Sequence, residues 1–257
     1  PGVHARDIGF RFAALLKQGG LSADLDYRVL EYAGDLEQFD LASRAALCST
    51  PTEIRAYGVF VPPSEAILEH ARSKAQRPFT PVYSDADAQY DADLKMDISA
   101  LEPQVSLPGS VENAVDVSEI EGLPVDHAFI GSCGSGMWED LVTAAGILKG
   151  RRLAPNVRLF IAPGSEATNR RLATEGLLGT FIEAGAVMLP PGCGPCNDAV
   201  IGPVHSGEVS ISTATNNNAG RFGAKDAKLY LGSPATVAAS AVAGKIADAR
   251  KLQDQNL

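Results

Sequence analysis

The sequence predicts an α/β fold made of two three-layer domains with largely parallel sheets. The first observation is the second half of the chain, where short apolar runs alternate with stretches of helical periodicity, as in repeated βα units. The second is the segment 104–124, whose Pro and Gly residues mark a boundary region. The third is size, because 257 residues with 45% hydrophobic content can form one large core or two smaller ones. We therefore predict α/β domains over residues 1–122 and 123–257.

The first half is expected to mix helices and strands. Apolar side chains recur at helical spacing between Ile8 and Leu16, which predicts a helix over residues 5–17. Ser64 follows two prolines and precedes a helical stretch, so it is the expected N-cap of a further helix. The other elements expected here are strands over residues 27–33, 59–61 and 96–103 and a helix over residues 35–47.

Two segments of the first half are expected to lack regular structure. Residues 78–92 are polar and acidic, and we interpret them as a solvated loop or domain edge. The alternative for this segment is a cation site rich in carboxylates. Residues 104–124 are also expected to form a loop, which leads into the second domain.

The second half alternates strands and helices along its length. The expected strands cover residues 128–132, 157–162, 187–189 and 209–213. The expected helices cover residues 138–148, 166–184 with a break near Gly179, and 234–252. Parallel strands joined in this way have right-handed crossovers, and ligands bind outside the carboxyl ends of such strands.

Charge and cysteine content argue against several classes of protein. The net charge is −9 and the pI about 4.9, without a run of basic residues, so we expect no nucleic-acid partner. No apolar run reaches the roughly 20 residues that a membrane-spanning helix needs, so we expect no membrane association. Four cysteines are too few for a disulfide framework and fit a reducing compartment, which makes the cytoplasm the expected location.

Three of the cysteines lie in loops rich in Gly and Pro. Cys133 ends an apolar run and precedes a predicted helix, while Cys193 and Cys196 form a C-x-x-C pair after another apolar run. In an open α/β sheet these positions fall near the carboxyl ends of strands, where ligand sites form. Three thiolates without a fourth ligand in view suggest a metal centre with one position left for a substrate.

Other uses of these cysteines stay open on their spacing alone. A redox C-x-x-C pair should open a helix soon after a strand, whereas this pair follows a Pro-Pro-Gly segment. Structural zinc needs four nitrogen or sulfur ligands, and the nearby His127 should point away from the strand end. Buried and unliganded thiols are the third alternative, since a cysteine without a ligand packs as a small hydrophobe.

A cluster with three cysteine ligands would leave one iron open to act as a Lewis acid on a β-hydroxy acid, which loses hydroxide without net redox change. Such a substrate is anionic, so arginines and helix N-termini should face it. Arg221 follows a predicted strand end and is a candidate for this role, with a surface arginine as the alternative. The start of the final predicted helix, at Ser233-Pro234, offers backbone N–H groups to an anion, with plain helix capping as the alternative.

Longer stretches of the sequence carry a resemblance to a known family. The matching segments are residues 5–8, 31–34, 130–133, 139–141, 144–145, 147–151, 154–155, 162–165, 175–176, 191–193, 220–221 and 232–235, together with Cys48, Glu53, Pro62, Gly185 and Cys196. They resemble the aconitase superfamily, and within it the large subunits of 3-isopropylmalate dehydratase and homoaconitase. The resemblance covers nearly the whole chain, and the three cysteines in their context are its most specific part.

The resemblance implies aconitase-like second and third α/β domains and a [4Fe–4S] cluster on Cys133, Cys193 and Cys196. It also implies that Glu53 is catalytic, as part of the proton and hydroxyl network, and that Arg221 pairs with a substrate carboxylate. Without the family, Glu53 is interpreted as an exposed helix glutamate.

The chain departs from the family pattern in three segments. The family's Cys-Asn-Met is Cys48-Ser49-Thr50 here, and two loops also differ. Gly134, Ser135 and Gly136 stand where the family has Thr-Asn-Ser, and Asn216 stands where it has an active-site arginine. We regard Ser135 and Asn216 as substrate-binding candidates. Loss of an arginine that clamps a carboxylate should weaken binding of a second acid group or change the substrate.

The resemblance further implies parts outside this sequence. The family's first domain is expected before Pro1, and its swivel domain is expected to follow or to be a small separate subunit. The expected function is an iron–sulfur hydro-lyase, as the large-subunit component of a dehydratase or isomerase of a small hydroxy-di- or tricarboxylic acid, 3-isopropylmalate-like (leucine biosynthesis) or aconitate-like. The alternative is a degenerate, non-catalytic α/β module that binds a partner subunit.

Overall fold

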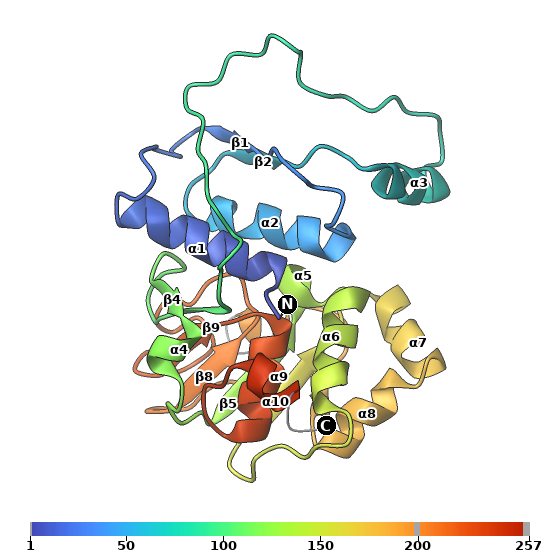
Figure 1. The fold of residues 1–257 in the computed structure, drawn as a ribbon. Coiled ribbons are helices and arrows are strands. Elements are labelled where there is room, and N and C mark those ends of the chain that lie inside the picture. Colours follow the sequence, from blue (N-terminus) through green and yellow to red (C-terminus); the bar gives the residue numbers. More distant parts are fainter. Residues whose placement is uncertain (1, 198–200, 254–257) are drawn as a thin grey trace.

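A large, mostly parallel sheet is the centre of the fold. The computed structural model describes residues 2–197 and 201–253. Within these residues, seven strands lie in the order β4-β3-β9-β8-β5-β6-β7, and Figure 1 shows this sheet below α1. Their bounds are β3 Gln104–Ser106, β4 Ala114–Asp116, β5 His127–Gly131, β6 Arg158–Ala162, β7 Val187–Met188, β8 Val209–Ser212 and β9 Lys228–Leu231. Neighbours from β9 to β7 are parallel, whereas β3 is antiparallel to β4 and β9. The prediction of an α/β fold with a largely parallel sheet is confirmed.

Both faces of this sheet are covered, which explains why β5 and β6 have apolar side chains on both faces. Ala128 and Ile130 of β5 point into a core with the helices on one face, and Phe129 points into a second core on the other face. The helices of the first face are α6 (Trp138–Leu148), α7 (Glu166–Thr174), α8 (Leu177–Ala184), α9 (Pro234–Ala243) and α10 (Ala249–Gln253). The second face is covered largely by α1 (Ala5–Lys17) and by the loops that leave the strand ends.

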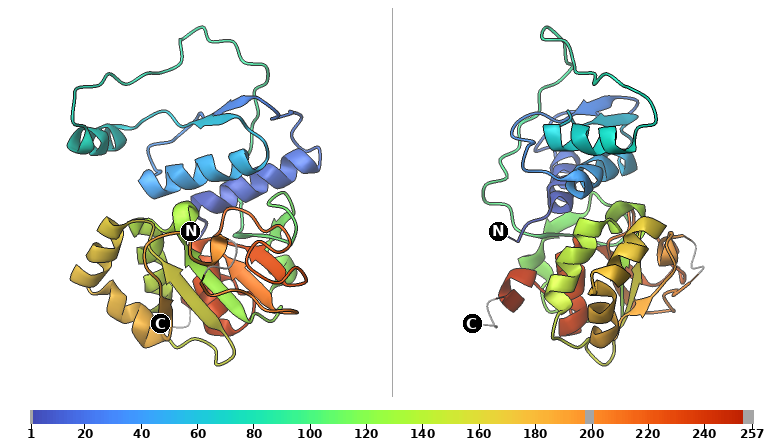
Figure 2. Two further views of the ribbon diagram at one scale, coloured as in Figure 1. Left: turned by 180° about the vertical axis from the view of Figure 1, so that it is seen from behind. Right: turned by 90° about the vertical axis from the view of Figure 1, so that its right-hand side faces the viewer.

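The first half of the chain stacks on this unit through two helices. Helix α1 contacts β3 and β4 of the large sheet and packs along α2 (Leu41–Glu53). Beyond α2 lie the parallel strands β1 (Val29–Glu31) and β2 (Gly58–Phe60), and the segment between α3 (Glu65–Lys74) and β3 arches over them (Figures 1 and 2). In the described part of the chain, no helix combines the length and apolar character needed to span a bilayer.

The division into domains at residues 122 and 123 stays a prediction. The two strands β3 and β4 precede this position, yet they hydrogen-bond within the large sheet. Helix α4 (Val117–Ile120) also precedes it, and it follows directly on β4.

Three predictions for the first half are wrong in position. The helix expected over residues 35–47 begins at Leu41, because the Asp40 side chain accepts a hydrogen bond from the Ser43 N–H and caps it. Residues 96–103 contain no strand, and the strand begins one residue after Pro103. Residues 104–124, expected to be a loop, contain β3, β4 and α4. Polar residues such as Gln104 hid these strands, since the Gln104 side chain is buried in contact with Asp116 of β4 and its backbone N–H is paired with the distant Asp7.

Two of the helices expected in the second half are interrupted or shortened at a glycine. The helix expected over residues 166–184 breaks at Gly176, whose φ of 80° is left-handed, and not near Gly179, which lies within α8. The helix expected over residues 234–252 ends at Gly244, where φ is 71°. Strand β9 was not expected at all.

Buried polar groups attach α1 to the large sheet. Asp7 is fully buried, and its carboxylate accepts hydrogen bonds from the His4 N–H at 2.7 Å and from the Gln104 N–H at 3.0 Å. The first bond completes a capping box at the start of α1, and the second joins α1 to β3. Burial raises the pKa of Asp7 to about 6, against the hydrogen bonds that lower it.

The raised pKa of Asp7 predicts a pH-dependent stability. Since the folded state holds this proton more tightly than the unfolded state, Asp7 adds stability below about pH 4 that is lost as the pH rises through about 6. The size of this contribution is on the order of 3 kcal/mol. Urea unfolding of the wild type and of Asp7→Asn across this pH range measures it. The difference between the two should shrink at high pH, whereas the exposed-loop control Asp87→Asn should follow the wild type throughout.

Candidate active site at the strand ends

Cys133 is presented by a sharp turn at the end of β5. Gly131 has φ 145° and Ser132 has φ 64°, so the chain turns abruptly from the strand into the short helix α5 (Ser132–Ser135). A Cβ atom on Gly131 would lie 2.1 Å from the Ala162 carbonyl oxygen of β6, and only glycine fits there. The Gly131 N–H donates to Thr213 Oγ1 at 2.9 Å. The turn leaves Cys133 exposed at the carboxyl edge of the sheet.

Cys193 and Cys196 lie in a loop that folds against the same edge. The loop leaves the sheet after β7, the Gly192 N–H donates to the Pro163 carbonyl at 3.2 Å, and a 3-10 turn covers Gly194–Cys196. Gly194 packs so closely on Phe129 that a Cβ atom would lie 3.0 Å from its ring. Cys193 is exposed and Cys196 is buried. All three predicted ligands therefore lie beyond the carboxyl ends of parallel strands.

The three thiols share one edge of the sheet without forming a closed metal site. Among residues 2–197 and 201–253, no three side chains of His, Cys, Asp or Glu are gathered so that they could hold a metal ion. The kind of donor fits an iron–sulfur cluster, which binds cysteine thiolates. The exposure of Cys133 and Cys193 also fits, because both thiols are accessible to a cluster from outside. The ligand role of the three cysteines stays a prediction.

Glu53 and Asn216 come from opposite halves of the sequence and meet in the fold. The Asn216 amide nitrogen donates to Glu53 Oε2 at 3.2 Å, and Glu53 is the last residue of α2. Asn217 anchors the loop, since its amide donates to the Leu107 carbonyl at 2.7 Å and to the Leu229 carbonyl at 3.0 Å. The loop that follows β8 is thereby held against α2, which brings two of the predicted site residues together.

Arg221 lies on the same loop with an unused hydrogen-bond donor. It is half-buried, and its Nε has no hydrogen-bond partner among the described residues. Asn216 Oδ1 is likewise buried without a partner in the described part of the chain. Buried polar groups of this kind are rare unless a ligand or water completes them. Both atoms are thus suited to bind a polar ligand.

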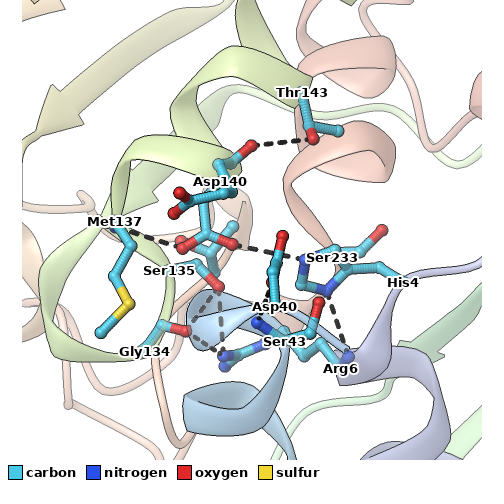
Figure 3. Close-up of polar contacts among 12 residues, drawn as sticks. His4, Arg6, Asp40, Ser43, Gly134, Ser135, Met137, Asp140, Thr143 and Ser233 are labelled. Carbon is cyan, nitrogen blue, oxygen red and sulfur yellow. Dashed lines mark hydrogen bonds and ion pairs between the residues drawn. The ribbon is translucent and has the colours of Figure 1, made fainter. Parts of the chain in front are cut away.

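Ser135 is buried and reaches an arginine. Its hydroxyl donates to the Gly134 carbonyl at 2.6 Å and accepts from Arg6 Nη1 at 3.5 Å. Figure 3 shows Arg6 with its guanidinium directed at Gly134 and Ser135. A role of Ser135 in substrate binding stays a prediction, while its contact in this structure is with the start of α1.

The structure also shows polar residues that sequence reasoning missed. His4 Nδ1 accepts from the Arg6 N–H at 3.1 Å, which leaves Nε2 to carry the proton, 3.3 Å from Asp140 Oδ1 (Figure 3). Asp140 is buried at the start of α6, and its other oxygen accepts from the Met137 N–H at 3.2 Å. The signal in the sequence was a charged pair, Arg6-Asp7, inside an apolar helix face.

His127 is turned away from the strand end, as its place on β5 predicted. Its Nδ1 lies 2.8 Å from Ser210 Oγ and its Nε2 lies 3.0 Å from the Gly202 carbonyl. Burial lowers the pKa of His127 to about 4, so the ring is neutral at pH 7. Its hydrogen bonds join β5 to β8 and to the loop at Gly202, and His127 does not extend the set of cysteines.

Comparison with known proteins identifies relatives over the whole chain. The model of the aconitase family (aconitate hydratase) matches residues 1–122 and 118–244. The 3-isopropylmalate dehydratase large subunit 1 of Methanopyrus kandleri is 40% identical over 251 residues, which are 97% of this chain and 59% of the relative. The probable methanogen homoaconitase large subunit of Methanosarcina mazei is 40% identical over 97% of this chain and 62% of its own length. The homoaconitase large subunit of Thermus thermophilus is 38% identical over 100% of this chain and 60% of its own length. The chain thus spans about three fifths of these relatives.

The close approach of β5 to β6 predicts a large effect of one methyl group. Gly131→Ala should lower the free energy of unfolding by about 3 kcal/mol or more, because the methyl group meets the Ala162 carbonyl and φ is unfavourable for alanine. The control is Gly146→Ala on an exposed position of α6, where a Cβ atom meets nothing within 4 Å. It should raise the free energy of unfolding by up to about 1 kcal/mol. Denaturant unfolding measures both, and a mild Gly131→Ala variant would contradict the close contact.

Proposed function

The chain belongs to the aconitase family, and we propose that it is the large-subunit component of an iron–sulfur hydro-lyase. The substrate is a small hydroxy-di- or tricarboxylic acid, 3-isopropylmalate-like or aconitate-like, as the names of the relatives suggest. One observation carries the proposal. Cys133, Cys193 and Cys196 lie at the same edge of the sheet, and the contact between Glu53 and Asn216 lies beside that edge.

The three cysteines are the residues that would hold a [4Fe–4S] cluster. When bound, such a cluster supplies a Lewis acid for the hydroxyl group that leaves or enters. The chain contributes the thiolates and the turn at Gly131 that directs Cys133 away from the core.

We assign proton transfer to Glu53 and binding of a substrate carboxylate to Arg221. The Asn216 amide holds Glu53 Oε2, which fixes the carboxylate plane, and Oε1 is the atom that we assign to proton transfer. Arg221 would bind a substrate carboxylate through its guanidinium, whose Nε lacks a protein partner among the described residues. Asn216 donates a hydrogen bond without a charge, so it holds an acid group less tightly than an arginine would.

A small swivel-domain subunit is the proposed partner, and the cytoplasm is the proposed location. Two of the relatives are named as large subunits of 3-isopropylmalate dehydratase and homoaconitase, and a large subunit implies a smaller one. In the competing proposal the chain is a degenerate, non-catalytic module that binds a partner subunit. The altered loop at Gly134–Gly136 and the lack of a gathered metal group among the described residues favour this alternative.

Cluster assembly tests the ligand assignment. After anaerobic reconstitution with iron and sulfide, the wild type should bind about four iron atoms per chain and absorb visible light. Serine at Cys133, Cys193 or Cys196 should remove most of the bound iron, because each substitution deletes one thiolate. Cys48→Ser is the matched control and should bind as much iron as the wild type, since Cys48 lies within helix α2 and outside the strand-end loops that carry the other three cysteines. A wild type that stays colourless and iron-free would overturn the proposal.

The role of Glu53 predicts a kinetic effect in the assembled enzyme. With the small subunit present, Glu53→Gln should lower kcat for hydration of a cis-alkene diacid by about 100-fold or more, because an amide cannot take up the proton. KM should change much less. The control Glu65→Gln changes an exposed glutamate of α3 that pairs with Arg72, and it should leave kcat unchanged. An equal effect of both substitutions would remove Glu53 from the mechanism.

A further inference from the structure

Arg6 is a buried arginine at the beginning of α1, and it lies against the loops of the candidate site. Only 1% of its surface is exposed. Its Nη1 donates to the Gly134 carbonyl at 3.3 Å, and its Nη2 donates to the Ala214 carbonyl. Gly134 follows Cys133 directly, and Ala214 opens the loop that carries Asn216 and Arg221. One guanidinium therefore joins three chain segments that are distant in sequence.

The packing around Gly134 shows that these segments meet closely. A Cβ atom on Gly134 would lie 3.0 Å from Arg6 Nη1, 3.2 Å from Thr215 Cγ2 and 3.3 Å from the Thr213 carbonyl. The position after Cys133 thus lies between the arginine and the end of β8. A movement of the Arg6 side chain would therefore change which conformations are open to the turn that carries Cys133.

The charge of Arg6 is placed among acidic groups. Asp140, Cys196, Asp7 and Cys133 all lie near enough to favour its charged form, while burial lowers the pKa of Arg6 to about 10. The guanidinium is therefore charged at pH 7 with two of the candidate thiols nearby. A buried cation attracts an anionic group bound at this edge of the sheet, because the low dielectric of the interior strengthens the attraction.

A second buried arginine shows what a purely structural role looks like. Arg44 is 5% exposed and donates to the carbonyls of Phe39, Pro62 and Leu36 at 2.8, 2.5 and 2.6 Å. These partners surround its own helix and lie no more than 18 residues away in sequence. Arg6 also donates to backbone carbonyls, but these carbonyls lie 128 and 208 positions away in the sequence, at the edge where the cysteines lie.

We propose that Arg6 is a positioning residue that ties the Cys133 turn to the loop of Asn216 and Arg221. It sets the direction of the Cys133 thiol relative to the substrate-binding side of the site. This inference rests on the proposed function in one respect, namely that Cys133 is a cluster ligand. The tie between the two loops stands on the hydrogen bonds of Arg6 alone.

Amide hydrogen exchange on the metal-free chain tests the tie. In Arg6→Gln, the amides of residues 133–136 and 214–217 should exchange about tenfold faster or more, because a buried hydrogen bond to a charged group is lost at each loop. In the control Arg44→Gln, these amides should keep the wild-type rates, and faster exchange should appear around residues 36–44. Arg6→Lys keeps the charge but has one ammonium nitrogen in place of the two guanidinium nitrogens that donate. The same amides should exchange faster than in the wild type, but by a smaller factor than in Arg6→Gln. This milder variant decides the question if Arg6→Gln does not fold.

A second readout separates this inference from the proposed function. After reconstitution with iron and sulfide, Arg6→Gln should show an altered electron paramagnetic resonance spectrum of the reduced cluster, which Arg6→Lys should partly restore and Arg44→Gln should not alter. If the wild type takes up no iron, the proposed function fails, and the exchange data alone decide the role of Arg6. Unchanged exchange at residues 133–136 and 214–217 in both Arg6 variants would overturn the inference.

Discussion

The contact between the backbones of β5 and β6 is the constraint on which the site depends. Gly131 brings the end of β5 so near the Ala162 carbonyl that no side chain fits between them. The chain has to leave this contact through a left-handed residue, Ser132, and this residue sets the direction in which Cys133 emerges. Backbone strain of this kind persists only where the surrounding structure enforces it. Here Thr213 at the end of β8 holds the Gly131 N–H, so three neighbouring strands determine one turn.

The first half of the chain contributes to the site through its buried polar groups. Helix α1 begins with His4, Arg6 and Asp7, and each of them contacts a different part of the large sheet unit: α6, the strand-end loops and β3. Apolar packing between α1 and the sheet supplies most of the attraction, but it is not directional. Hydrogen bonds to buried groups are directional, and leaving them unmade is costly. They therefore determine how α1, and α2 beside it, are placed relative to the cysteines.

Local patterns predicted the elements that depend on local contacts. Helix 5–17 and helix 138–148 have the predicted bounds, because their apolar periodicity and their ends are encoded within a few residues. Strands β3 and β4 could not be predicted in this way, since Gln104 and Ser106 are polar yet buried. Their backbone and side chains are paired only once the sheet and α1 have come together, as in the bond from the Gln104 N–H to Asp7. The strand predicted over residues 96–103 shows the opposite error, because apolar content favours a strand only where a neighbouring edge can pair with it.

The same distinction applies to the candidate site. The three cysteines are visible in the sequence because their residue type and spacing carry the signal, whereas the contact of Asn216 with Glu53 joins residues 163 positions apart.

That contact bears on the choice of substrate through charge. Between Ala214 and Phe222, Arg221 is the single basic residue, and the remaining polar side chains are a threonine and three asparagines. An amide that donates to Glu53 orients the carboxylate without cancelling its charge. An arginine in its place would pair with Glu53, and Glu53 would then compete with a substrate carboxylate for that arginine. An acid group of the proposed substrate would therefore be attracted at this loop by the Arg221 guanidinium and repelled by the Glu53 carboxylate of α2. Such a loop suits a ligand that presents a single carboxylate to it and a neutral polar or apolar group to Asn216.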